Sequence, residues 1–281
     1  MEILENDNNN PNDRANSNRP TFRTLSVALA RTGLAGTVSS NRLTVFAPTD
    51  EAFAALGLNQ RNITSVPNLT EILLYHVLGD VVYSTDLTTS FVTTLNGAAL
   101  DVNLDSGVQI NDANVILADR QARNGVIHVI DTVLFPPTNN LLELAESFDP
   151  EFSVLVDALE IAGLDSVIAS GGVFTVFAPT NDAFIALLGE LDGFDSLEDF
   201  DTPEEIELLT NVLLYHVVEG RVYSSDLSSG PVSTLNGNFD LDLSDFTITD
   251  ANDREAGLIT DLLNVQATNG VVHVIDRVLL P

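Results

Sequence analysis

Cysteine and lysine are both missing from this chain of 281 residues. Without cysteine there is no disulfide to report an oxidising compartment, and no thiol for nucleophilic catalysis or metal binding. Without lysine there is no amine side chain for Schiff-base chemistry. All 11 basic residues are therefore arginines, against 41 acidic residues.

The resulting net charge of −30 is unevenly divided along the chain. Residues 1–137 carry 14 acidic residues and 8 arginines, net −6, whereas residues 138–281 carry 27 and 3, net −24. Phosphate groups are bound through clustered basic side chains, so this composition argues against nucleic acid and against an anionic membrane surface as partners. The acidic excess suits a solubilising surface, adaptation to high salt, or weak recruitment of divalent cations.

Long hydrophobic runs are also absent. No apolar run approaches the roughly 18 residues that a membrane-spanning helix needs, so we expect no membrane insertion. The first residues, 1–7, lack the basic start and apolar core of a signal peptide. Residues 1–20 are rich in Asn, Asp and Pro and predict an irregular segment. The hydrophobic fraction of 44% supports packed cores in the remainder.

One closing motif occurs twice, at residues 124–136 and 269–281. Each copy begins with Asn-Gly, which predicts a tight turn because both residues tolerate positive φ. Each continues as an apolar, β-branched run with one histidine, typical of a strand buried on both faces, and ends at a proline. This repetition predicts two domains, residues 1–137 and 138–281.

The segments before the closing motif follow the same order in both halves. Helices come first and strands with alternating apolar residues follow, which predicts an α+β arrangement with an antiparallel sheet rather than parallel βαβ units. Thr49 is a predicted helix N-cap, and residues 202–205 form a predicted capping box. The main predicted elements are a helix at 22–33, a strand at 43–49, helices at 70–78 and 202–217, short strands at 81–84 and 222–224, and hairpins at 95–97 and 235–237.

These motifs, in this order, resemble the fasciclin domain, present twice. They are Thr-Val-Phe-Ala-Pro-Thr at 44–49 and 175–180, Leu-Leu-Tyr-His-Val at 73–77 and 213–217, Leu-Asn-Gly at 95–97 and 235–237, and the two closing motifs. The resemblance covers residues 22–137 and 141–281. The opening helix of the second repeat, residues 141–147, has only Ile3 and Leu4 as its counterpart in the first.

The resemblance implies a fold and a role. The implied fold is a wedge of two β-sheets, about seven strands, flanked by helices, present twice in tandem. The implied role is non-enzymatic cell adhesion or matrix contact, outside the cell or at its surface, with a protein or polysaccharide surface as partner. An alternative is a carrier that holds a small apolar or saccharide ligand in a cleft between helices and sheet.

Four residues carry the family's Tyr-His pair, proposed in animal members to belong to an integrin-binding surface. They are Tyr75, His76, Tyr215 and His216. Neighbouring helical residues point about 100° apart, so the two side chains do not share one small site. Because the pair lies in an apolar segment, we favour a core pair that locks helix to sheet over a direct binding role.

The remaining candidates for chemistry are sparse. His128 and His273 lie in the closing strands, and we expect them to be core residues bonded to backbone. Zinc needs four ligands, whereas each repeat has two histidines and no cysteine, so we predict no metal centre. There is no Gly-x-Ser-x-Gly, phosphate loop or dinucleotide fingerprint, so we predict no catalytic residue and no cofactor.

Two acidic segments resemble cation sites only in part. Residues 250–255 begin like a calcium loop, but Glu255 stands where the sharp turn requires glycine. Residues 190–207 contain nine acidic residues. Ordered coordination of Ca²⁺ needs six or more converging oxygens, so we favour a solvated acidic face over a specific site there.

Overall fold

The computed structural model describes residues 19–191, 193–194 and 196–281. The chain divides into two compact units, Met1–Pro136 and Pro137–Pro281. This division falls one residue before the boundary expected from the repeated motif. Most of the predicted irregular segment, together with the expected Ile3–Leu4 counterpart of the opening helix, lies outside the described residues.

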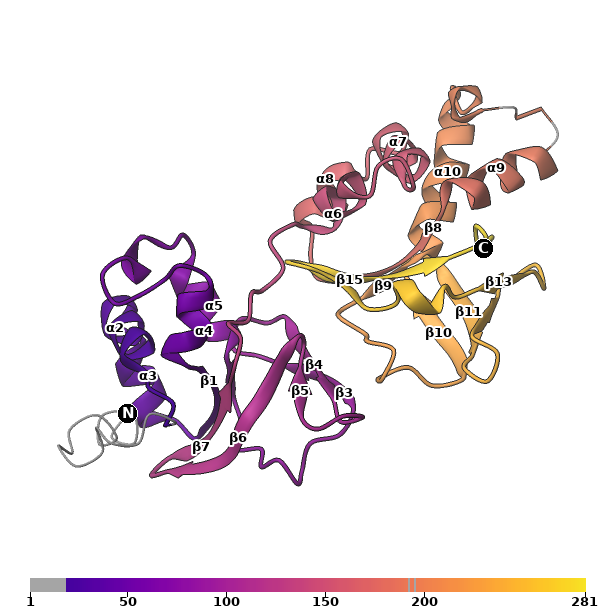
Figure 1. Cartoon of the computed structure of the whole chain (residues 1–281). Helices are drawn as coiled ribbons and strands as arrows, with labels where there is room; N and C mark the ends of the chain where they lie inside the picture. Colours follow the sequence, from indigo (N-terminus) through magenta and orange to yellow (C-terminus); the bar gives the residue numbers. More distant parts are fainter. Residues whose placement is uncertain (1–18, 192, 195) are drawn as a thin grey trace, which may run out of the picture. The chain divides into compact units, whose positions relative to one another are not determined.

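The helices of the first unit gather beside strands β1 and β7 (Figure 1). As predicted, α2 ends at Gly33, which adopts a φ of 75° that glycine tolerates without strain. Thr49 caps α4, because its Oγ1 accepts a hydrogen bond of 3.1 Å from the amide of Ala52. The helical segments are α2 (Arg23–Thr32), α3 (Leu34–Ser40), α4 (Asp50–Ala55), the 3₁₀ turn η2 (Ile63–Ser65) and α5 (Leu69–Tyr75).

The strands of the first unit form one seven-stranded sheet in the order β2-β1-β7-β6-β5-β4-β3. The expected α+β class and strand number are confirmed. The expected antiparallel sheet is found in all strand pairs of this unit but one, because β1 runs parallel to β7 along six residue pairs. The strands are β1 (Leu43–Pro48), β2 (Val77–Leu78), β3 (Ser90–Thr93), β4 (Ala99–Asn103), β5 (Gln109–Ile110), β6 (Ala113–Ala122) and β7 (Gly125–Ile130).

Asn124 and Gly125 occupy different positions in the turn before β7 from those predicted. The tight turn exists, but its central residues are Arg123 and Asn124, since Ala122 pairs with Gly125. Neither Asn124 nor Gly125 has a positive φ. Glycine is needed because an added Cβ on Gly125 would lie 2.0 Å from the carbonyl oxygen of Leu43. The close approach of a parallel neighbour, rather than the turn, therefore explains this glycine.

The short strands predicted at 81–84 and 222–224 are also wrong, because neither segment belongs to a sheet. In the first unit, the amide of Val82 donates 2.8 Å to Oγ1 of Thr44, and its carbonyl bonds Nε2 of His128 at 2.9 Å. Buried side chains thus satisfy backbone groups that a strand neighbour would otherwise satisfy. The edge strands β2 and β9 lie a few residues earlier in the chain.

The second unit repeats the helical layer (Figure 1). Thr202 and Glu205 form the predicted capping box, with Pro203 in the first turn of α10. The helical segments are α6 (Leu141–Ser147), α7 (Ser153–Ile161), α8 (Asp165–Ser170), α9 (Asn181–Glu190), η3 (Leu197–Asp199), α10 (Pro203–Tyr215) and η4 (Thr260–Leu262).

The strands of the second unit form two four-stranded sheets, β10-β11-β12-β13 and β14-β15-β8-β9. In the first unit, β6 joins both halves of the sheet and its register shifts twice against β7. In the second unit, η4 interrupts the corresponding stretch and separates β13 from β14. The strands are β8 (Phe174–Pro179), β9 (Val217–Glu219), β10 (Gly230–Thr234), β11 (Gly237–Asp242), β12 (Thr247–Thr249), β13 (Glu255–Gly257), β14 (Val265–Ala267) and β15 (Gly270–Ile275).

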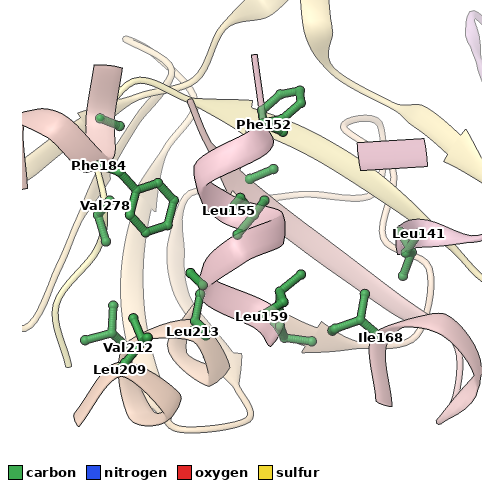
Figure 2. Close-up of a cluster of buried hydrophobic side chains, with 14 of the residues drawn as sticks. Leu141, Phe152, Leu155, Leu159, Ile168, Phe184, Leu209, Val212, Leu213 and Val278 are labelled. Atoms are coloured by element: carbon green, nitrogen blue, oxygen red, sulfur yellow. The ribbon is translucent and has the colours of Figure 1, made fainter. Parts of the chain in front are cut away.

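Each unit buries two apolar clusters, one between helices and strands and one on the other side of the central strands. Figure 2 shows the larger cluster of the second unit, to which α6, α7, α9 and α10 contribute. The parallel pair β8–β15 lies between the two clusters, with Ala178 and Val274 in one and Phe177 and Ile275 in the other. A strand with both faces buried explains the unbroken apolar run of the closing motif.

Candidate functional site

The Tyr-His pair closes α5 in the first repeat and α10 in the second. His76 follows the last residue of α5 and is only 2% exposed. Its Nδ1 lies 2.7 Å from the carbonyl oxygen of Ile72, and its Nε2 accepts a 3.0 Å hydrogen bond from the amide of Leu134. An amide N–H can only donate, so Nε2 carries no proton and Nδ1 donates to the carbonyl. The ring is therefore neutral, with both nitrogens occupied.

His216 repeats this arrangement after α10. Its Nδ1 donates to the carbonyl oxygen of Val212 at 2.7 Å, and the amide of Leu279 donates to its Nε2 at 2.9 Å. Burial lowers the pKa of His216 to about 4, although its bond to Val212 opposes the shift. Burial likewise lowers the pKa of His76 to about 4. Both rings are thus neutral at neutral pH and fixed by backbone at either side.

The tyrosines of the pairs point elsewhere. Tyr75 is 2% exposed and donates its hydroxyl hydrogen to the carbonyl of Ala99 at 2.8 Å. Tyr215 is 1% exposed and bonds the carbonyl of Asn238 at 2.5 Å. Each tyrosine therefore reaches β4 or β11, whereas its histidine neighbour reaches the segment after the closing strand. The two side chains of a pair do not converge on one site.

The closing-strand histidines have the opposite tautomer. Nε2 of His128 lies 2.9 Å from the carbonyl of Val82, and the amide of Asp119 donates to its Nδ1 at 3.3 Å. His273 makes the equivalent bonds with Val222 and Asn264, at 2.9 and 3.4 Å. Neither ring is exposed. The proton is therefore on Nε2 in both, and neither ring nitrogen is available to a ligand.

A further pair of equivalent positions was missed in the sequence. Asp119 and Asn264 adopt φ values of 57° and 60°, a conformation that Asp and Asn tolerate better than most residues. Oδ1 of Asp119 accepts a hydrogen bond of 2.8 Å from the amide of Ser84. The hydroxyl of Ser84 donates a second hydrogen bond to the other carboxylate oxygen. Oδ1 of Asn264 likewise accepts a hydrogen bond of 2.7 Å from the amide of Ser224. The preference of Asp and Asn for turns is the signal that could have found them.

This arrangement does not form a nucleophile–base pair. The Ser84 hydroxyl bonds Asp119, and the imidazole of His128 bonds only backbone groups. Hydrogen bonds from Ser84 lower the pKa of the Asp119 carboxyl. The carboxylate is therefore a weaker base than an ordinary aspartate. Activation of a serine requires its hydroxyl to donate to a base with a matched pKa. Ser84 and Asp119 instead anchor a loop.

The segment that begins like a calcium loop is closed by its own chain. Asp250 is 5% exposed, and its Oδ1 accepts from the amides of Asn252 and Arg254 at 2.9 and 3.0 Å. Its Oδ2 accepts from the amide of Leu280 at 3.0 Å. Across the described residues, no group of three or more His, Asp or Glu side chains is placed to hold a metal ion.

The basic side chains of the second unit include two that are tied to internal partners. Nη1 of Arg221 donates to the carbonyls of Ala267 and Gly270 at 2.9 and 2.7 Å. Arg254 donates to Glu190 at 3.0 Å. Most of the described acidic side chains of residues 138–281 are exposed, with little basic charge to balance them. Within the described part of the chain, no helix is long and apolar enough to span a bilayer.

The fold and motifs agree with comparison to known proteins. The family model of the fasciclin domain matches residues 20–136 and 150–281. The chain belongs to the fasciclin family. Each of its two fasciclin repeats contains a complete Tyr-His pair and closing strand.

Relatives of this fasciclin chain occur in bacteria and animals. Protein sll1483 of Synechocystis sp. is 38% identical over 130 residues, covering 46% of this chain and 67% of that protein. Transforming growth factor-beta-induced protein ig-h3 of Sus scrofa is 32% identical over 258 residues, covering 85% and 34%. Human periostin is 28% identical over 278 residues, covering 95% and 30%. The chain thus spans about a third of the length of these two animal relatives.

A solved structure also matches. It is a FAS1 domain pair from the insect cell adhesion molecule Fasciclin I, 20% identical, covering 92% of this chain and 96% of that one, with a TM-score of 0.44.

Proposed function

We propose that this protein is a non-enzymatic adhesion or surface-interaction module that acts outside the cell or at its surface. The match of the fasciclin family model to both halves of the chain carries this proposal. Its partner is a protein or polysaccharide surface. The contact depends on surface complementarity rather than on one reactive residue.

The histidines support a non-enzymatic role. Each described ring makes a hydrogen bond at both nitrogens with backbone groups of its own repeat. General acid–base catalysis needs a ring nitrogen within reach of substrate and a pKa near the operating pH. The nitrogens of His76 and His216 are occupied by backbone groups, so they fail the first condition. Their pKa is lowered to about 4, so they fail the second at neutral pH.

In this proposal the Tyr-His pairs belong to the core, and partner contact occurs elsewhere. Tyr75, His76, Tyr215 and His216 are each no more than 3% exposed. A receptor would have to open the fold to reach them. We therefore assign their role to locking the long helix to the strands and to the closing segment.

Divalent cations offer a physical route for contact by the acidic second repeat. Its net charge of −24 repels other anionic surfaces at low ionic strength. A cation shared between two carboxylate-bearing surfaces removes that repulsion and links them. Weak, dispersed binding of this kind needs no preformed cage.

Adhesion of coated beads tests the proposal. Beads carrying the whole chain are applied to a panel of polysaccharides and cells, first in calcium and then in chelator. Retention in calcium that is lost in chelator supports a cation-bridged contact, and retention in both supports contact through neutral or apolar surface. No retention on any surface would contradict an adhesive role.

A charge-neutralised variant locates the contact. Glu198→Gln, Asp201→Asn, Glu204→Gln and Glu207→Gln together remove four exposed charges and leave the capping residues Asp199 and Glu205 in place. The matched control removes four exposed charges of the first repeat, by Glu51→Gln, Asp80→Asn, Asp105→Asn and Asp112→Asn. Calcium-dependent retention should fall in the first variant and persist in the second.

A further inference from the structure

The second repeat contains an apolar pocket of about 190 Å³ between α9 and α10. Its walls include Phe184 and Leu187 from α9, Leu197 and Phe200 from the following segment, and Leu209 and Val212 from α10. Figure 2 shows Phe184, Leu209 and Val212 on the same side of the cluster. Every lining residue is apolar except Asn252. The pocket therefore offers dispersion contacts and almost no polar partner.

One wall of this pocket is specific to the second repeat. Equivalent motifs are 131 residues apart at Phe46 and Phe177 but 140 apart at Tyr75 and Tyr215. The nine additional residues lengthen the helices rather than the connection, because α9 and α10 have 10 and 13 residues whereas α4 and α5 have 6 and 7. Leu187 and Leu188 lie in the longer part of α9, and Leu208 lies in the longer part of α10. In the first repeat the connection from α4 to α5 places Ile63 in the core, 1% exposed.

Local hydrogen bonds and ring contacts hold the wall in place. Ser196 and Asp199 form a reciprocal cap at the start of η3, and Thr202 and Glu205 form another at the start of α10. The ring of Phe200 packs against Phe194 with centroids 4.6 Å apart and is only 6% exposed. The wall residues Leu197 and Phe200 thus lie between two capped helix starts, and a pocket that is already formed costs a ligand little ordering.

The volume and lining define the class of ligand. A cavity of about 150 Å³ lined by Leu, Ile and Phe in another protein remains dry and binds benzene. We propose that the second repeat binds a small uncharged apolar molecule, about the size of a substituted benzene ring, in this pocket. A second apolar pocket, beside Leu141 and Phe152, measures only about 40 Å³ and is too small for such a ligand.

Charge distinguishes this ligand from anionic amphiphiles. The pocket offers no cationic side chain, so a buried carboxylate would lose its hydration without compensation. Residues 138–281 also carry a net charge of −24, which lowers the local concentration of anions. A neutral apolar molecule loses no charge hydration in the pocket and is not repelled by the acidic repeat.

The experiment titrates the whole chain with toluene and, separately, with benzoate, and follows the methyl signals of Leu and Val by NMR. We expect saturable one-to-one binding of toluene, with shifts at Leu209 and Val212, and at least tenfold weaker binding of benzoate. Absence of saturable toluene binding, or equal binding of both probes, would overturn the proposal.

Paired substitutions test the location. Leu209→Phe should fill the pocket and weaken toluene binding at least tenfold. Leu69→Phe, at the equivalent helix position of the first repeat, should leave the affinity unchanged. If Leu209→Phe does not fold, Leu188→Phe narrows the pocket from a half-buried position. Toluene binding that survives the folded filling variant, or that falls equally in Leu69→Phe, would contradict this site whatever the bead assay shows.

Discussion

The backbone amide of Leu134 donates a hydrogen bond of 3.0 Å to Nε2 of His76. These residues are 58 positions apart, one after the closing strand β7 and one directly after α5. Leu279 and His216 repeat the relationship at 2.9 Å in the second fasciclin repeat. In each repeat the imidazole thus joins the end of a helix to the final segment of the fold.

His216→Leu should destabilise the second repeat by about 2–4 kcal/mol, because the amide of Leu279 and the carbonyl of Val212 lose their partner in a dry environment. Urea unfolding followed by NMR signals of each repeat measures this loss. Ile185→Ala, at a helix position that is 62% exposed, is the control and should change stability by less than about 0.5 kcal/mol. Equal effects of the two substitutions would show that His216 makes no such connection.

Acid should weaken both repeats through the same histidines. Their pKa is about 4 in the folded protein and 6.5 for an unperturbed histidine, so the unfolded chain binds more protons between these values. The contribution of these histidines to the free energy of unfolding is therefore fully present above pH 6.5, and it is lost as the pH falls towards 4. Each histidine should contribute about 3 kcal/mol to this fall.

The measurement is the slope of unfolding free energy against pH between 6.5 and 4, for the whole chain and for His216→Gln. Protonation of surface carboxylates relieves repulsion in the same range and acts in the opposite direction. The difference between the two proteins isolates the histidine. A slope that is the same in both would contradict the lowered pKa of His216.

Local features of the fold could be predicted from the sequence because they depend on neighbouring residues. Thr49 at the start of α4, Gly33 at the end of α2 and the Thr202–Glu205 capping box are all where short-range chemistry predicts them. The repeated Tyr-His and closing motifs also indicate the family from the sequence alone.

Long-range pairing could not be predicted in the same way. The strand β7 is buried on both faces, so its apolar run carries no information on the direction of its neighbour β1, about eighty residues earlier. The prediction of a strand at Val82 is wrong because the hydrogen-bond partners of its backbone, Thr44 and His128, are side chains distant in sequence. The pocket depends on how the longer helices α9 and α10 pack, and the sequence offset reveals them only as extra length.

Gly125→Ala and Gly270→Ala should each destabilise their repeat by about 3 kcal/mol or more. An added Cβ would lie 2.0 Å from the carbonyl oxygen of Leu43 in the first case and 2.3 Å from that of Phe174 in the second. Backbone on the parallel neighbour cannot move away without loss of ladder hydrogen bonds. Thermal and urea unfolding of the purified variants measures the effect.

Gly36→Ala is the matched control for these glycines. Gly36 lies inside α3, and an added Cβ there meets nothing within 4 Å. Alanine has the higher helix propensity, so this variant should be unchanged or more stable by up to about 1 kcal/mol. Equal tolerance of alanine at Gly36 and Gly125 would show that β1 and β7 do not approach so closely.

Salt should stabilise the protein through its uneven charge. Repulsion among the acidic side chains of residues 138–281 is screened when the Debye length falls from about 10 Å in dilute buffer to about 3 Å in molar NaCl. The melting temperature of the second repeat should therefore rise in molar NaCl. The variant lacking the charges of Glu198, Asp201, Glu204 and Glu207 should show a smaller rise, because fewer repulsions remain to be screened. Calorimetry of both proteins across a salt series provides the test, and an unchanged or lower melting temperature in salt would remove high-salt adaptation as the reason for this composition.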